Sequence, residues 1–254
     1  MAHVLVEVRA GVAEVTLDRP EKRNALHWPM VRDLRAALAH LAADDAVRVV
    51  LVRGAGDLAF SAGADYRAMA GASPEEQEAY TEDFARAAFD LAQLPQPTVG
   101  AVAGYAYGGG AELAAALDIR VGAPTTRFRF PGAVFGRITG TQRLPQIVGV
   151  ARAKELIFTG RVVAADEAER MGLLNRVVPL GRLLGEARAL AEAIAANQPL
   201  SLRLSKAIVN ETFGAPPAEA FERELAAERA CIASPELRAA FSAAFERQLR
   251  QPGG

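Results

Sequence analysis

The sequence predicts an α/β fold in which strands crossed by helices form a core and a run of helices follows it. Three features lead to this prediction. Apolar runs with the continuity of buried strands alternate with helical patterns as far as Thr141, small-residue turns join several of these runs to helices, and helical patterns dominate beyond that point. The 254 residues suffice for one large core with an appended helical piece, which we place at residues 1–195 and 196–254.

The first elements are predicted from alternation and from helical spacing. Residues 4–8 and 13–17 alternate around Arg9-Ala10-Gly11, which indicates a β-hairpin. The run "VRVVLVRG" (47–54) is too continuously apolar for a half-exposed strand and therefore predicts a strand buried on both faces. Between them, apolar side chains recur at the spacing of a helix, at Val31, Leu34, Leu38 and Leu41.

The central elements repeat a strand–strand–helix grouping. Pro74 opens a helix that we expect to run to about residue 94. "TVGAVAG" (98–104) is the next strand, and a Gly-rich turn leads from it into the helix "GAELAAALD" (110–118). "DIRVGAP" and "RFRF" are predicted as short strands. The grouping recurs only loosely, but it suits a spiral of ββα units.

The last third of the chain is predicted to be mostly helical, apart from residues 161–163 and 174–178. Apolar side chains form stripes at helical spacing in two places. Such stripes indicate surfaces that are buried between subunits. Their members are Leu183, Ala187, Leu190 and Ile194 in the first stripe, and Leu237, Phe241, Phe245 and Leu249 in the second.

Composition excludes several classes of function. The formal net charge is −1, so no global field favours nucleic acid or an anionic membrane. The single cysteine, Cys231, excludes an internal disulfide and multi-cysteine metal sites, and the three histidines lack metal-like spacing. No apolar run approaches the ~20 residues that span a bilayer, and the N-terminus lacks a signal-peptide pattern. We expect a cytoplasmic protein without metal, nucleic-acid or membrane partners.

Two Gly-rich turns stand at the ends of apolar runs and lead into helical patterns. They are "FSAGADYRAM" (60–69) and the turn within "VAGYAYGGGAELAAALDI" (102–119). Such a turn leaves backbone N–H groups pointing into open space, where they favour an anion or a developing oxyanion. Two turns from separate strands could converge on one carbonyl oxygen, each donor contributing roughly 3 kcal/mol to transition-state stabilisation. Taken singly, each could also be only a tight turn.

Other readings of these turns fit less well. A dinucleotide-binding fingerprint fails in its spacing, because Leu113 stands where the third glycine belongs. No Walker A sequence is present. Ser61 does not lie in a nucleophile elbow and has no histidine near it in sequence, which disfavours serine hydrolysis.

Five motifs, in this order, resemble the crotonase, or enoyl-CoA hydratase/isomerase, superfamily. They are "RNAL" (23–26), "FSAGAD" (60–65), "GYAYGGGAELA" (104–114), "TQRLPQIVG" (141–149) and "AKELIFTGRVVAADEAERMGLLNRVV" (153–178). The resemblance covers almost the whole chain. It implies a crotonase-like spiral of ββα units with C-terminal trimerising helices, and therefore a homotrimer or a hexamer.

The resemblance also implies a site. An acyl-CoA thioester would be the substrate, with no separate cofactor because coenzyme A is part of it. The backbone N–H groups of Ala62 and Gly109 would form the oxyanion hole, and Glu112 would be the acid/base. The implied substrate-binding positions are Asn24, Ala25, Leu26, Ala64, Asp65, Tyr66, Met69, Tyr107, Gly108 and Gly132.

The chain departs from the hydratase pattern at one edge of the implied site. Hydratases share proton transfer between two glutamates. Glu112 matches the first, whereas Gly132 stands where the second belongs, and the loop 137–140 is shorter than usual. Hydratase chemistry is favoured because Glu112 is the hydratase position. An isomerase, a decarboxylase, a hydrolase and a non-catalytic acyl-CoA binder remain open. RNA binding is disfavoured by the three lysines.

Overall fold

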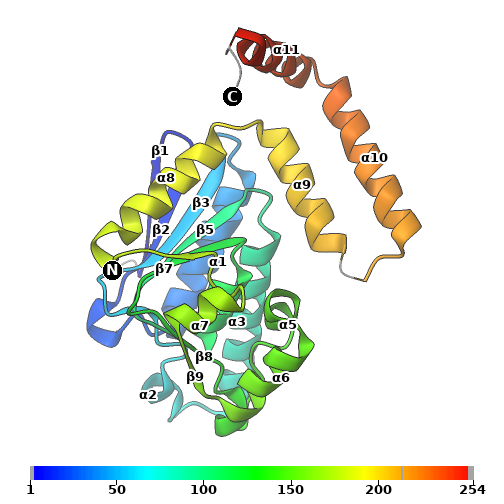
Figure 1. The fold of residues 1–254 in the computed structure, drawn as a ribbon. Helices are drawn as coiled ribbons and strands as arrows, with labels where there is room; N and C mark the ends of the chain where they lie inside the picture. Colours follow the sequence, from blue (N-terminus) through cyan, green and yellow to red (C-terminus); the bar gives the residue numbers. More distant parts are fainter. Residues whose placement is uncertain (1–2, 213, 251–254) are drawn as a thin grey trace. The chain divides into compact units, whose positions relative to one another are not determined.

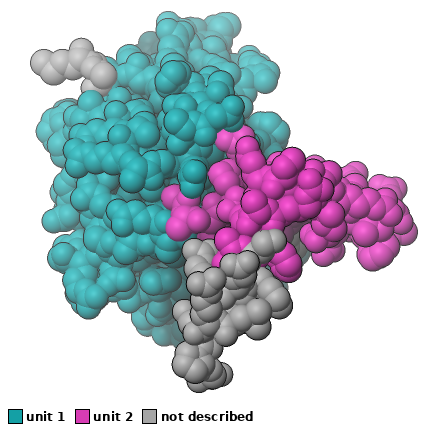
Figure 2. Space-filling model, turned by 90° about the horizontal axis from the view of Figure 1, so that it is seen from above, with its two compact units in different colours: residues 1–194 teal, residues 195–254 magenta. Residues whose placement is uncertain are grey.

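The computed structural model describes residues 3–212 and 214–250, which form two compact units. Contacts between Cα atoms divide the chain into residues 1–194 and 195–254 (Figure 2). The boundary expected from the sequence lay after residue 195. The first unit holds all the strands found in the described residues and all the residues of the implied site, and the described part of the second is helical.

A six-stranded sheet forms the first layer of this core. Its order is β1-β2-β3-β5-β7-β10, and only the β1–β2 pair is antiparallel (Figure 1). The predicted hairpin is confirmed, and the predicted buried strand is β3, whose side chains are almost all buried. The strands are β1 (Val4–Arg9), β2 (Val12–Leu17), β3 (Val49–Gly54), β5 (Thr98–Val102), β7 (Ile119–Gly122) and β10 (Arg176–Val177).

A second, four-stranded sheet is built from strands that follow strands of the first sheet along the chain. It has the order β4-β6-β8-β9, built from β4 (Ala59–Ser61), β6 (Tyr105–Tyr107), β8 (Arg127–Arg129) and β9 (Val162–Ala164). Strands β3, β5 and β7 each lead into β4, β6 and β8 of the smaller sheet, and a helix follows each time. The predicted spiral of ββα units is therefore confirmed. Because β4 and β6 are parallel neighbours, the turns that follow them leave the sheet at the same edge.

Two long helices cover the six-stranded sheet and pack on each other. They are α1 (Trp28–Ala43) and α3 (Pro74–Gln93) (Figure 1). The four predicted apolar positions of α1 are all buried. Helix α3 begins as the sequence predicted, at Pro74, and a capping box of Ser73 and Glu76 satisfies its first backbone N–H groups.

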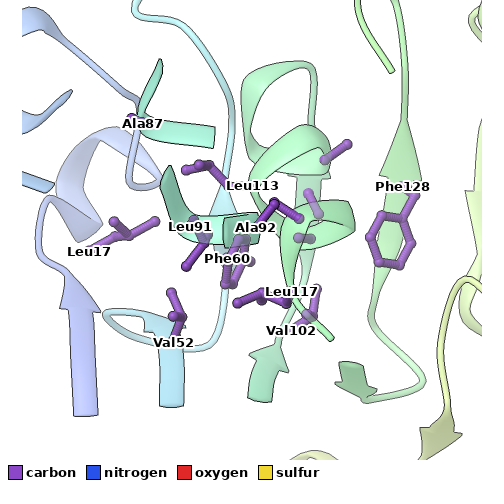
Figure 3. Close-up of a cluster of buried hydrophobic side chains, with 14 of the residues drawn as sticks. Leu17, Val52, Phe60, Ala87, Leu91, Ala92, Val102, Leu113, Leu117 and Phe128 are labelled. Carbon is purple, nitrogen blue, oxygen red and sulfur yellow. The ribbon is translucent and has the colours of Figure 1, made fainter. Parts of the chain in front are cut away.

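The shorter helices complete the first unit. They are α2 (Tyr66–Met69), α4 (Gly109–Ala116), α5 (Arg143–Val148), α6 (Val150–Thr159), α7 (Ala165–Arg170) and α8 (Leu183–Ala195). In α8 the predicted stripe is buried at Leu183 and Ala187, and the buried face continues through Ala191 and Ala195. The core brings α3 and α4 together with the strands: Leu91, Leu113 and Phe60 belong to one buried cluster (Figure 3).

The second unit consists of α9 (Pro199–Thr212), α10 (Pro217–Ala233) and α11 (Pro235–Arg250). Neither α9 nor α10 has a buried residue, and Val209, Phe221 and Ile232 are exposed. In the second predicted stripe, Phe241 is exposed, while the side chains of Phe245 and Leu249 lie outside the described residues. No helix in the described part of the chain is long and apolar enough to cross a membrane.

Candidate active site

The two Gly-rich turns lie against each other. Gly63 has a φ of 86°, and a Cβ atom added to it would lie 2.4 Å from the Tyr107 carbonyl oxygen and 3.1 Å from the Gly109 nitrogen. A Cβ atom on Gly110 would lie 2.2 Å from the Ser61 carbonyl oxygen. Only glycine permits this approach. The turns predicted to converge are therefore in contact, and the small residues are required by their packing.

Each turn holds a backbone N–H group near the contact between them that donates no hydrogen bond within the described residues. The first is that of Gly109, which is the first residue of α4 and so has no partner within the helix. The second is that of Ala64. Ala64 pairs with Leu26 in an isolated parallel bridge, which uses the backbone groups on either side of Ala64 and leaves its own N–H pointing away.

The prediction that Ala62 supplies an oxyanion donor is wrong. Its N–H donates to the carbonyl oxygen of Arg23 at 3.0 Å, so the amide is already occupied. The physical reason is that the segment containing Arg23 runs alongside the turn and takes up this donor. The N–H of Ala64, two residues later, has no backbone partner. The N–H of Gly109 has no such partner, and its oxyanion role stays a prediction.

Glu112 lies one turn into α4, on the same helix end as Gly109. Its Oε1 accepts a 2.7 Å hydrogen bond from the N–H of Gly140. Desolvation raises the pKa of Glu112 to about 7, although the hydrogen bond from Gly140 acts in the opposite direction. A carboxyl group with this pKa exchanges protons readily near neutral pH, as acid/base catalysis requires.

The segment 24–26 builds the wall beside the first turn. Asn24 is fully buried, and its side-chain amide donates to the carbonyl oxygens of Ala55 at 3.0 Å and Ala59 at 2.8 Å. The carbonyl oxygen of Ala25 accepts a 2.7 Å hydrogen bond from Arg19. Leu26 is also buried. The side chains of Asn24 and Leu26 are thus used in holding the turn.

The short helix α2 follows the first turn. It begins at Tyr66 and ends at Met69, and Asp65 directly precedes it. Asp65 caps α2 by accepting from the N–H of Ala68, and it pairs with Arg19 at 3.2 Å. Desolvation raises the pKa of Asp65, but these two contacts outweigh it and hold the pKa below its ordinary value. Tyr66 is half exposed, and its ring lies 5.2 Å from that of Phe135. Met69 is partly buried against the core.

Comparison with known proteins gives the family. A sequence profile described as enoyl-CoA hydratase/isomerase matches residues 7–250. The short-chain-enoyl-CoA hydratase of Clostridium acetobutylicum is 35% identical over 252 residues, covering 97% of this chain and 95% of that protein. The crotonyl-CoA hydratase of Syntrophomonas wolfei is 34% identical over 251 residues, covering 97% and 96%.

Comparison with solved structures points to the same family. The crystal structure of enoyl-CoA hydratase from Bacillus anthracis matches with a TM-score of 0.93 and 33% identity, covering 96% of both chains. The chain belongs to the enoyl-CoA hydratase/isomerase family of enzymes. Its crotonase-type fold, expected from the sequence, is thereby confirmed.

This family member has no room for a side chain at position 132. Gly132 is buried, and its N–H donates to Oγ1 of Thr139 at 3.2 Å. A Cβ atom on Gly132 would lie 2.6 Å from this oxygen and 2.7 Å from the carbonyl oxygen of Arg137. The short loop 137–140 therefore fills the space into which a second glutamate would project. The same loop brings the N–H of Gly140 to Glu112.

Substituting Gly132 with alanine is expected to destabilise the protein by about 1–3 kcal/mol, because the added methyl group overpacks against Thr139. The free energy of unfolding in urea measures this effect. Gly71→Ala is the matched control, since a Cβ atom at Gly71 meets nothing within 4 Å. Equal stability of the two variants would show that the loop yields easily and that position 132 is not crowded.

The side chain of Tyr107 faces a cavity that Glu112 does not line. Residues alternate along β6, so Ala106 is buried while Tyr105 and Tyr107 share the opposite face, with ring centroids 5.2 Å apart. Both line a cavity of about 430 Å³ with Arg127, and Glu112 is not among its lining residues. Tyr107 contributes to the turns through its carbonyl oxygen, and Gly108 contributes its positive φ of 50°.

Sequence reasoning missed Tyr80, Phe84 and Gly140. Tyr80 and Phe84 lie one turn apart in α3, and their spacing signals only a buried helix face. Gly140 is 28 residues from Glu112 in sequence, and no pattern marks that contact. The described residues contain no group of three or more His, Cys, Asp or Glu side chains able to hold a metal ion.

Proposed function

We propose that the protein is an enoyl-CoA hydratase in which Ala64 and Gly109 bind the thioester oxygen and Glu112 transfers the proton. The observation that carries this proposal is a carboxyl group with a pKa of about 7 beside two neighbouring turns that each present an unused N–H group. The hydratase names of relatives that align with nearly the whole chain support it. Coenzyme A belongs to the substrate, so the reaction needs no separate cofactor.

The chemistry follows from these groups. Two N–H donors on the thioester oxygen polarise the conjugated carbonyl and withdraw electron density from C3. Ionised Glu112 accepts a proton from water as its oxygen adds to C3, which places negative charge on the thioester oxygen. The N-terminal end of α4 favours this charge. The protonated Glu112 then delivers its proton to C2, so that one carboxyl group serves both steps.

Turnover of a panel of thioesters tests this proposal. The panel holds crotonyl-CoA, a longer 2-enoyl-CoA, a 3-enoyl-CoA, methylmalonyl-CoA and a β-diketone thioester. Loss of the conjugated absorbance of the 2-enoyl substrates, with formation of 3-hydroxyacyl-CoA, is the expected result. Absence of hydration with every 2-enoyl substrate would contradict it. Binding without exchange of any α-proton in deuterated water would indicate a non-catalytic acyl-CoA binder.

A second candidate is isomerisation of a 3-enoyl thioester to the conjugated 2-enoyl form. The crowding at Gly132 favours it, because an isomerase needs one carboxyl group to move a proton between two carbons. Glu112 would remove the C2 proton and return it to C4. Appearance of the conjugated absorbance from the 3-enoyl substrate, without prior hydration activity on crotonyl-CoA, would select this reaction.

The pKa of Glu112 predicts how activity depends on pH. As the base, Glu112 must be ionised in the free enzyme. The value of kcat/KM should therefore rise about tenfold per unit of pH below about 7 and level off above it. Initial rates of crotonyl-CoA hydration across this range measure the profile. A flat profile, or one that falls as pH rises through 7, would show that ionised Glu112 does not act as the base.

We further propose that the protein assembles as a homotrimer or as a hexamer. Helices α9 and α10 bury no side chain within the chain, although Val209, Phe221 and Ile232 are apolar and exposed. A second copy of the chain would cover them. Light scattering after size exclusion reports the assembled mass.

A further inference from the structure

We propose that Tyr80 is a positioning residue whose hydroxyl group fixes the direction of the Ala64 N–H donor through the carbonyl group of Leu26. This proposal rests on the proposed function of the Ala64 amide. In this proposal, Tyr80 does not contact the substrate. Its role is to hold the segment against which the first turn is built.

Tyr80 reaches the site from α3 and remains a hydrogen-bond donor there. It is only 6% exposed, and its hydroxyl donates to the carbonyl oxygen of Leu26 at 2.8 Å. Desolvation raises the pKa of the phenol, and the negative charges of Asp65 and Glu112 raise it further. The hydroxyl therefore stays protonated at every pH at which the site works.

Leu26 transmits this contact to Ala64. The N–H of Leu26 donates to the Gly63 carbonyl oxygen at 2.8 Å, and the Leu26 carbonyl oxygen accepts from the N–H of Asp65 at 3.0 Å. The Gly63 carbonyl and the Ala64 N–H belong to one planar trans peptide unit, in which they point in opposite directions. The hydrogen bond to Leu26 therefore aims the Ala64 N–H away from Leu26. A shift of Leu26 would rotate this donor.

The same helix also braces the second donor. Phe84 lies one turn after Tyr80, on the same face of α3. A Cβ atom on Gly109 would lie 3.0 Å from Cζ of Phe84 and 3.3 Å from Cδ1 of Leu26. Leu26 thus packs beside Gly109 while it pairs with Ala64. Through these residues α3 sets the separation of the two N–H groups.

Loss of the Tyr80 hydroxyl would leave the rest of this segment satisfied. The Leu26 carbonyl oxygen keeps its hydrogen bond from Asp65, so no buried carbonyl is left without a partner. The fold should therefore tolerate the change. Its effect should fall on the geometry of the oxyanion donors, where displacements on the order of 1 Å lower rates substantially.

Tyr80→Phe tests this role, with Gln96→Met as the matched control. Gln96 is fully buried, and it also donates a 2.8 Å side-chain hydrogen bond to a buried carbonyl, that of Leu41. Rates with crotonyl-CoA give kcat and KM. The near-ultraviolet absorbance of bound acetoacetyl-CoA gives the fraction present as enolate, which reports stabilisation of the oxyanion without any turnover.

In Tyr80→Phe we expect kcat to fall roughly tenfold, KM to stay within about twofold and the enolate fraction to drop. Gln96→Met should change none of these. Equal losses in both variants, an unchanged kcat and enolate fraction in Tyr80→Phe, or loss of its folded state would each overturn the positioning role. A wild-type protein that neither hydrates crotonyl-CoA nor binds the enolate would instead refute the proposed function, whatever the variant does.

Discussion

Replacing Glu112 with glutamine is expected to lower kcat for hydration by about 10³-fold, the usual contribution of a positioned acid/base group. Glutamine has the same shape and can still accept the hydrogen bond from the N–H of Gly140, so the local structure should persist. It cannot accept a proton from water or deliver one to C2. Stopped assays with crotonyl-CoA and α-proton exchange in deuterated water measure the loss.

The control for this variant is Glu7→Gln, which removes an exposed carboxyl group that pairs with Arg9 on the first strand. Its kcat should equal that of the wild type. Unchanged thermal unfolding of Glu112→Gln would show that the loss is chemical. If Glu112→Gln kept more than about a tenth of the wild-type kcat, another group would be moving the proton.

Gly109→Pro is expected to lower kcat by about 10²–10³-fold, because it removes one of the two N–H donors from the oxyanion site. Gly109 is the first residue of α4, where proline is compatible with a helix and where no hydrogen bond within the helix is lost. The remaining donor, at Ala64, would hold the thioester oxygen alone. Binding of a saturated acyl-CoA should change far less than kcat.

The variant Gly109→Ala distinguishes the effect of losing the N–H donor from the effect of crowding by an added Cβ atom. Both variants add a Cβ atom, which would lie 3.0 Å from Phe84, but only the alanine variant keeps the N–H group. The alanine variant should therefore be clearly faster than the proline variant. Equal rates would mean that crowding against Phe84 is responsible, and that the Gly109 N–H is not an oxyanion donor.

Much of the fold could be predicted from the sequence because its long elements carry periodic signals. The hairpin, α1, α3 and the buried strand β3 follow from alternation, helical spacing or a continuous apolar run. The strands β4 and β6 have three residues each. They are too short to show a period, and β6 lies inside a segment that looks like a turn.

The site was only partly predictable, because its donors are selected by contacts distant in sequence. The motif "FSAGAD" contains several backbone N–H groups, and nothing within it shows which is free. The pairing with residues 23–26 determines which N–H is free. It occupies the N–H of Ala62 and leaves the N–H of Ala64 without a backbone partner. Glu112 was predicted as the acid/base through the resemblance to the family, whereas its partner Gly140 became known only from the folded loop.

The tight packing around Gly132 also bears on how this protein could change over evolutionary time. The Cβ atom of a glutamate introduced there would crowd Oγ1 of Thr139 and the Arg137 carbonyl oxygen. Any route to a second carboxylate at this position therefore passes through an insertion that lengthens the loop 137–140. The order of the two mutations matters, since a glutamate that came first would be crowded against Thr139 until the loop lengthened. A library limited to point mutations would not find the double change.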